Sequence, residues 1–266
     1  MINRTLYFRE MRNSIKILLF FLAVITLYVT MIISIYNPEM MSMLENFSQF
    51  LPKFTSAVGM SPGANSLIGF MISYLYGFIL LIFPMVFSII RGNGLVSKYV
   101  ESGSMVTLLA APVKRRSVAT TQALVLLSGI LFLILYTTLL QWISAEIYFP
   151  GQVSGLALCT LNVGLLSLQL FIGGICFFTS CYFSGTKWSL AFGAGIPGMM
   201  YVLKMLANVG GNAENMKYLT FFTLFDPNGL NQGEMQAVIG TMILFFGSCL
   251  LFSLGILSFC KKDLHI

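Results

Sequence analysis

The sequence predicts an all-α polytopic membrane protein that crosses the bilayer six times and forms a single transmembrane domain over residues 1–266. Composition is the first reason, because 57% of the residues are hydrophobic and only 9% are charged, whereas a soluble domain carries about 25% charged residues. Six long apolar stretches are the second reason. The third is an uneven distribution of Lys and Arg among the segments that join them. A soluble globular protein is therefore excluded.

Each apolar stretch is long enough to cross a hydrocarbon core of about 30 Å, which takes about 20 helical residues. Only helices are expected, because an open sheet edge in lipid would leave backbone groups without hydrogen bonds. The predicted spans cover approximately residues 17–36, 67–90, 118–143, 155–180, 188–207 and 238–259.

The basic residues predict how the spans are oriented. Twelve of the 15 Lys and Arg residues fall on one side, and six of the nine acidic residues fall on the other. Because cytoplasmic loops carry the excess of Lys and Arg, both termini are predicted to be cytoplasmic. The same rule explains the net charge of +6, so no nucleic-acid partner is expected. The twelve residues are Arg4, Arg9, Arg12, Lys16, Arg91, Lys98, Lys114, Arg115, Arg116, Lys187, Lys261 and Lys262.

Three segments outside the spans have patterns of their own. Residues 3–16 mix apolar and basic side chains, which predicts an interfacial amphipathic helix that leads into the first span. Residues 40–54 place apolar side chains at helical spacing and predict a helix that lies on the outer membrane surface or caps a cavity. In residues 208–237, an apolar run too short to span is interrupted by the turn signal DPNG at 226–229. We expect an external hairpin there, re-entrant or lying on the surface, before the sixth span.

The longest polar and basic loop is residues 98–116, KYVESGSMVTLLAAPVKRR, between the second and third spans. Ser102 or Ser104 can cap a short helix over 105–111, and Pro112 ends it, because the residue before a proline avoids the α region. Such a helix could lie on lipid or dock on a soluble partner. Its apolar face contains Met105, Leu108 and Leu109.

The sequence offers no catalytic or metal centre. His265 is the only histidine, and its predicted cytoplasmic position excludes a Ser–His or Cys–His pair within the spans. The phosphate-binding motif GxxxxGK[ST] does not occur. The five cysteines lie in or at the ends of apolar stretches without metal-ligand or disulfide spacing. We expect a chain that is not an enzyme and holds no metal or cofactor itself.

Few polar residues are predicted inside the spans. Asn162 and Gln169 are seven residues apart, near one face of the fourth span, where they can form interhelical hydrogen bonds or line a substrate path. Lys204 lies about one turn from the outer end of the fifth span, where it can extend to the interface or hold an acidic group of a substrate.

The fifth span also contains small residues that permit close approach between helices. A dimer seam, a hinge beside Pro197 and packing within the chain are all compatible with them. These residues include Ala191, Gly195 and Gly198.

Two motifs are similar to those of type-2 ABC exporter permeases. One of them, F-x-[KR]-[KR]-D-L, covers residues 259–264 near the C-terminus. Six spans, an amphipathic lead-in helix and an external hairpin also agree with that family, so the resemblance extends over the whole chain. The other motif, E-x-G-[ST]-x3-L-L-x2-P-x2-R, lies in the 98–116 loop. It consists of Glu101, Gly103, Ser104, Leu108, Leu109, Pro112 and Arg115.

The resemblance implies a function and a set of partners. The short helix would be a coupling helix, seated through its apolar face in a separate ATPase subunit that binds ATP and Mg. Glu101 to Arg115 would transmit its movement. A second permease, identical or related, would complete the translocation path in a bacterial plasma membrane, surrounded by membrane lipid. Family members often have an acidic residue where this chain has Thr107, so the polar contacts with the ATPase would differ.

Composition also bears on the cargo. The absence of charge at mid-span and the abundance of Phe, Met and Leu favour an apolar or amphipathic substrate, and a peptide such as a toxin or an antimicrobial is the first expectation. Lipid or drug efflux by a permease of the same family is an alternative. A secondary carrier would need a broken helix or a charge within the membrane, and a membrane immunity factor would sequester a peptide without transport.

Overall fold

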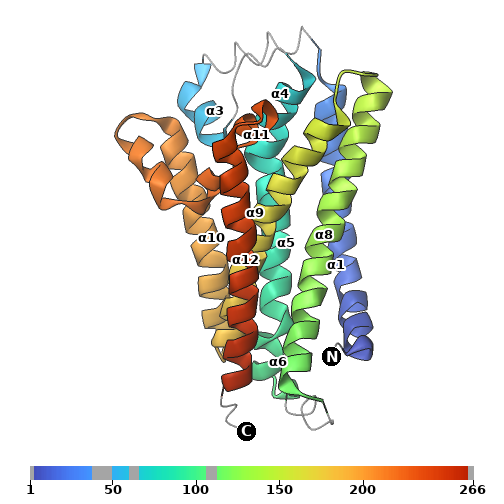
Figure 1. Ribbon diagram of the computed structural model, residues 1–266, viewed down its shortest axis with the longest axis vertical. Coiled ribbons are helices and arrows are strands. Elements are labelled where there is room, and N and C mark those ends of the chain that lie inside the picture. Colours follow the sequence, from blue (N-terminus) through green and yellow to red (C-terminus); the bar gives the residue numbers. More distant parts are fainter. Residues whose placement is uncertain (1–2, 38–49, 60–65, 106–112, 263–266) are drawn as a thin grey trace.

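The computed structural model describes residues 3–37, 50–59, 66–105 and 113–262. Within these ranges the chain is helical and contains no strand. Six helical stretches are long and apolar enough to cross a membrane, and they form an elongated bundle (Figure 1). The predicted number of six spans is confirmed, and each helix is long and apolar enough to cross a membrane.

The spans are longer than the apolar stretches that predicted them. The second consists of four consecutive segments, which are α4 (Leu67–Met71), the π-helix η1 (Ile72–Ile79), α5 (Leu80–Leu95) and α6 (Ser97–Glu101). The other spans are α1 (Arg4–Ser34), α8 (Arg115–Tyr148), α9 (Gly155–Tyr182), α10 (Thr186–Val209) and α12 (Met235–Lys261). Shorter helices are α3 (Pro52–Val58), the 3-10 helices η2 (Gly211–Leu219) and η3 (Phe221–Leu224), and α11 (Pro227–Gln232).

Helix α9 is the centre of the bundle and contacts α5, α8, α10 and α12. In α9, 72% of the most apolar stretch is buried inside the bundle, whereas only 22% of the corresponding stretch of α10 is buried. Small residues allow these close contacts. A Cβ added to Gly173 would lie only 2.6 Å from Ile130 Cδ1 of α8, so a larger residue would displace the end of this side chain.

The second span is irregular because Pro84 interrupts its hydrogen-bond ladder. Proline has no N–H, so the carbonyl of Leu80, four residues earlier, loses its usual intrahelical donor. Gln169 of α9 supplies a replacement, since its Nε2 donates to Leu80 O at 3.2 Å and to Leu81 O at 3.0 Å. The fourth span therefore stabilises the break in the second.

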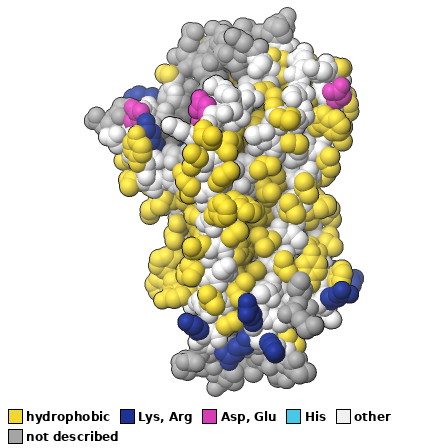
Figure 2. Space-filling model, in the orientation of Figure 1, with side chains coloured by type: hydrophobic (Ala, Val, Ile, Leu, Met, Phe, Trp, Pro, Cys, Tyr) yellow, Lys and Arg dark blue, Asp and Glu magenta, His cyan; other side chains and the backbone are white. Residues whose placement is uncertain are grey.

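Charged side chains distinguish the two ends of the bundle. On the face that Figure 2 shows, Lys and Arg gather mostly at one end, and the visible Asp and Glu lie near the other. We call the first the basic end; α1, α8 and α10 begin there, and α6, α9 and α12 end there (Figure 1). Its assignment to the cytoplasm stays a prediction.

The predicted interfacial helix over residues 3–16 is continuous with the first span. Asn3 caps α1, and its Oδ1 accepts a hydrogen bond from Leu6 N at 3.1 Å. The basic side chains of this stretch are exposed, as the amphipathic pattern predicts, but Glu10 and Ser14 on the opposite face are buried. The first turns of α1 therefore pack on the bundle.

The segment between α10 and α12 forms short helices. Residues 226–229, which we expected to form a turn, instead begin α11, where Asp226 Oδ1 accepts a hydrogen bond from Asn228 N at 3.0 Å. Pro227 occupies the first helical position, where its missing N–H is not needed. Three apolar side chains of this segment are buried in the bundle, namely Phe222, Phe225 and Leu230.

Two further expectations concern the end opposite to the basic end. A re-entrant path of the 208–237 segment through lipid stays a prediction. Of the helix expected over 40–54, residues 40–49 lie outside the described residues, and the chain is helical in α3.

Candidate functional site at the basic end of the helices

The structure describes both ends of the 98–116 loop. Three residues of the expected coupling motif lie outside the described residues, namely Leu108, Leu109 and Pro112. Five of the residues expected to couple to an ATPase are described, namely Glu101, Gly103, Ser104, Met105 and Arg115.

The loop leaves α6 through a turn that favours glycine. Gly103 has a φ of 69°, in the left-handed region where a side chain would be strained. The Ser102 and Ser104 hydroxyl oxygens are 2.5 Å apart and share a hydrogen bond. We expected Met105 on the face that contacts a partner, but its side chain is only 2% exposed and belongs to the core of its own chain.

Glu101 connects the first end of the loop to the fifth span. Its Oε2 accepts a hydrogen bond from the backbone N–H of Thr186 at 2.9 Å. Thr186 is the first residue of α10, and the first N–H groups of a helix have no intrahelical acceptor. The carboxylate therefore stabilises this N-terminus both as an acceptor and through the helix dipole.

Arg115 connects the second end of the loop to the sixth span. Its Nη1 donates to the carbonyl of Lys262, directly after α12, at 2.8 Å. Lys262 Nζ donates in turn to Cys181 O, in the last turn of α9, at 3.1 Å. Burial lowers the pKa of Lys262. These bonds join the start of α8 to the ends of α9 and α12.

A buried charge cluster of Glu10, Arg91 and Tyr99 stands beside the first end of the loop. Arg91 Nη2 of α5 lies 3.6 Å from Glu10 Oε2 of α1, and their side chains are 11% and 3% exposed. The same Nη2 donates to Glu10 backbone O at 3.3 Å. The Tyr99 hydroxyl of α6 donates to the other carboxylate oxygen. Because buried charges need a partner and further hydrogen bonds, this cluster holds α1, α5 and α6 in one arrangement.

The sequence contained a partial signal for this cluster. From the charge count, Glu10 and Arg91 were expected only as cytoplasmic charges. Leu6, Glu10 and Ser14 follow at four-residue spacing and therefore share a helix face. A carboxylate on the face that carries Leu6 needs a positively charged or hydrogen-bonding partner. The partner stands 81 positions away, and helical periodicity cannot identify it.

A cavity of about 530 Å³ opens beside the cluster, between α1, the end of α5, α6 and the start of α10. Polar side chains such as Asn13, Asn93, Lys98 and Ser104 line it. Among the residues that the structure describes, its lining contains neither His nor Cys. Binding and mechanical connection are what this arrangement supports.

The polar residues of the fourth span are buried and bonded within the chain. Asn162 Nδ2 donates to Gln141 Oε1 of α8 at 2.8 Å, and the Tyr76 hydroxyl of η1 donates to the same oxygen at 3.0 Å. Gln169 is engaged with the carbonyls that precede Pro84. These contacts support the interhelical interpretation, and a substrate path along these residues stays a prediction.

The small residues predicted for a dimer seam lie on an open side of the fifth span. Ala191 and Gly195 are exposed and Gly198 is partly exposed, and a Cβ on either glycine would meet nothing within 4 Å. Gly193 instead packs on α9, where an added Cβ would lie 2.8 Å from a threonine oxygen. An open small-residue face is thus available for the predicted dimer seam. Lys204 lines a cavity at the end opposite to the basic end.

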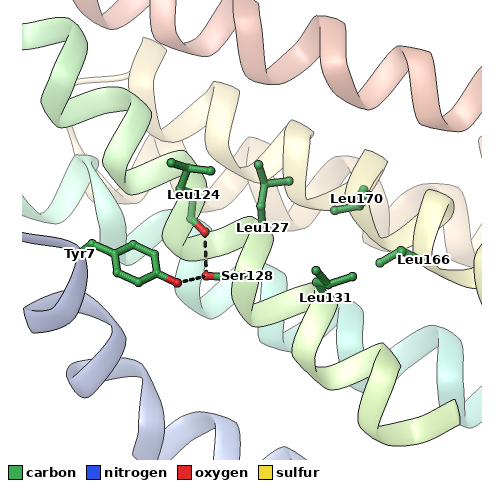
Figure 3. A pocket seen from close by; sticks show the side chains of 7 residues that line it. All are labelled: Tyr7, Leu124, Leu127, Ser128, Leu131, Leu166 and Leu170. Atoms are coloured by element: carbon green, nitrogen blue, oxygen red, sulfur yellow. Dashed lines mark hydrogen bonds between the residues drawn. The ribbon is translucent and has the colours of Figure 1, made fainter. Parts of the chain in front are cut away.

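An apolar groove of about 470 Å³ lies beside α8 and α9, with Tyr7 of α1 at one edge. Figure 3 shows leucines of both helices along it and the Tyr7 hydroxyl pointing to Ser128, to which it donates at 3.1 Å. Ser128 donates to Leu124 O at 2.7 Å. The polar groups of Tyr7 and Ser128 are thus paired within the chain, and the other described lining residues of the groove are leucines.

Comparison with known proteins adds no family assignment, because no protein-family model, curated protein or solved structure matches this chain. The resemblance to exporter permeases therefore rests on the motifs and the order of elements given above.

Proposed function

We propose that this chain is the membrane-spanning permease subunit of an ATP-driven ABC exporter in a bacterial plasma membrane, with the basic end in the cytoplasm. A separate ATPase subunit binds ATP and Mg and docks on the 98–116 loop. A second permease, identical or related, completes the translocation path. The chain has no catalytic role of its own. Its cargo is an apolar or amphipathic molecule, first of all a peptide, toxin or antimicrobial.

The observation that supports this proposal most is the attachment of the loop at both ends. Glu101 is bonded to the start of α10, and Arg115 is bonded to the residue that follows α12. A loop attached in this way passes a displacement on to the helices, because its ends cannot move independently of them. A partner that pushes on the loop would therefore act directly on the fifth and sixth spans.

The buried charge cluster extends this connection to the first span. Tyr99 lies in α6, directly before the loop, and bonds to Glu10 of α1. A displacement of α6 thus reaches α1 as well as α10. Movement of several spans together is what alternating access to a shared cavity requires.

The proposal is tested with the chain purified together with the ATPase encoded beside its gene and reconstituted in liposomes. Phosphate release is compared for the wild type, Leu108→Asp and the control Lys53→Gln, an exposed residue of α3. Leu108→Asp should lower hydrolysis by about tenfold or more, since an unpaired carboxylate in an apolar groove costs several kcal/mol. The control should equal the wild type.

Other results would replace the proposal. ATP hydrolysis that neither requires this chain nor changes with Leu108→Asp would reject the coupling role. Transport driven by an ion gradient without the ATPase would identify a secondary carrier, and peptide capture without transport would identify an immunity factor. ATP-dependent movement of lipid or drug in place of peptide would keep the permease and change its cargo.

A further inference from the structure

A cavity of about 590 Å³ lies at the end opposite to the basic end, between α3, η1, α10 and residues 222–228. Figure 1 shows α3 and α11 at this end, away from both termini. The volume falls within the range of about 300–1,000 Å³ that is typical of small-molecule sites. Aromatic rings of Tyr76, Phe222 and Phe225 line the cavity together with charged and amide side chains.

Irregular backbone shapes this cavity. Residues 72–79 are π-helical, and π-helical turns occur frequently at functional sites. Gly59, directly after α3, lies against this helix, and a Cβ added to it would lie 3.5 Å from Gly77 Cα, an ordinary contact distance. Glycine is favoured at this position because its φ is 81°, where another residue would be strained. The turn at Gly59 therefore forms one side of the cavity.

Lys204 supplies a positive charge within the span. Its Nζ lies 5.9 Å from the centre of the Phe222 ring, which is a cation–π distance. With the residues that the structure describes, this ammonium forms neither a hydrogen bond nor an ion pair. A charged side chain inside a membrane span is costly and marks a binding site or ion path by default.

The other charged groups of the cavity are already engaged. Asp226 caps α11 by accepting the Asn228 N–H, and Lys217 pairs with Glu214 at 2.8 Å. The Tyr76 hydroxyl donates to Gln141. Asp226 also attracts Lys204 electrostatically, but no hydrogen bond or ion pair joins these two described residues, so the N–H donors of Lys204 remain available to a ligand.

We propose that this cavity binds an amphipathic anion, with a carboxylate at Lys204 Nζ and an apolar part against the apolar lining, which includes Ala207 and Pro227. Coulomb attraction between the two charges is strengthened by the low dielectric of the surroundings, and the apolar lining supplies contact area. The carboxylate can come from a fatty acid or from the C-terminus of a peptide. Only the role of this ligand as cargo rests on the proposed export function; its binding does not.

The test uses the purified full chain in an uncharged maltoside detergent, without any ATPase. Binding is measured by isothermal titration calorimetry with two matched pairs of probes: 4-phenylbutyrate and its amide, and an N-acetylated Leu-Phe dipeptide as the free acid and as the amide. The variants are Lys204→Met, which removes the charge, and Lys204→Arg, which keeps it. Lys187→Met is the control, because Lys187 is an exposed lysine at the opposite end of the same helix.

We expect at least one of the acids to bind saturably to the wild type, Lys187→Met and Lys204→Arg. Two pairs should bind at least about tenfold more weakly than the acid binds to the wild type: the amide with the wild type, and the acid with Lys204→Met. In each pair a charge-assisted hydrogen bond is lost. Tighter binding of the dipeptide than of phenylbutyrate would identify a peptide as the source of the carboxylate, and the reverse order a fatty acid.

Equal affinity for acid and amide, no binding of either acid, or unchanged binding by folded Lys204→Met would overturn the inference. If Lys204→Met does not fold, the acid–amide comparison on the wild type and Lys204→Arg decides. Failure here leaves the coupling of the 98–116 loop to ATP hydrolysis untouched, since that coupling is measured separately with the ATPase complex.

Discussion

Replacing Glu10 by Gln removes the negative charge of the buried cluster with Arg91 and Tyr99 while nearly preserving its shape. The Arg91 side chain is only 11% exposed, so Glu10→Gln would leave its guanidinium buried without a counter-charge. Removing one partner of a buried ion pair costs about 3–5 kcal/mol. The bond from Arg91 to the Glu10 backbone carbonyl survives the change. We therefore expect a loss of about 3 kcal/mol in the free energy of unfolding, at the lower end of that range.

The assay is equilibrium unfolding by SDS in mixed maltoside micelles, followed by circular dichroism. Glu10→Gln, Arg91→Met and the double variant are compared with the wild type. The free energy of unfolding of the double variant should fall by less than the sum of the two single losses, because neither charge is then left without its partner. Arg9→Gln is the control, since this neighbouring arginine is exposed and its loss should stay within about 0.5 kcal/mol.

Two results would refute this reasoning. One is a Glu10→Gln variant within about 0.5 kcal/mol of the wild type, which would mean that water reaches the guanidinium. The other is strict additivity in the double variant, which would mean that the two side chains do not interact across α1 and α5.

Two further predictions use the same unfolding measurement. Gln169→Leu should lower the free energy of unfolding by about 1–3 kcal/mol, because it leaves the buried carbonyls of Leu80 and Leu81 without this donor. In a Pro84→Ala background the loss should shrink, since the new N–H can bond to Leu80 O; an equal loss in both backgrounds would contradict the role of Gln169 at the break. Gly240→Ala should cost at least about 1–3 kcal/mol, because its Cβ would lie 2.3 Å from Leu224 backbone O. Gly195→Ala meets nothing within 4 Å and should be neutral or stabilising, so equal effects at the two glycines would argue against this packing of α12.

Local patterns were sufficient for the spans and insufficient where the chain folds back on itself. The DPNG run at 226–229 has turn chemistry, yet Asp226 and Pro227 are also favourable at a helix start, and packing of the segment on the bundle selected the helix. Residues 3–16 were correctly predicted as amphipathic. Their basic side was expected near the lipid headgroups, and the pattern did not indicate that Glu10 turns inward to Arg91.

The candidate site was likewise predictable from the sequence only in part. The 98–116 loop and its motif are continuous in the chain, so the sequence alone was enough to identify them. The hydrogen-bond partners of Glu101 and Arg115 were not predictable, because Thr186 and Lys262 lie 85 and 147 positions away. Lys204 was recognised as unusual from its place in a span, but only packing of α3, η1 and residues 222–228 around it creates a cavity.

By itself the sequence determined that the chain has six membrane-spanning helices and one end richer in basic residues. Lipid imposes this, since every span must satisfy its own backbone hydrogen bonds over about 20 apolar residues, and both requirements are local. Tertiary structure alone decided which polar side chains meet. Arg91 is stable in the bundle because Glu10 stands opposite, and the break at Pro84 is stable because Gln169 reaches its free carbonyl. Such pairs depend on which helices become neighbours, and that follows from packing of the whole bundle around α9.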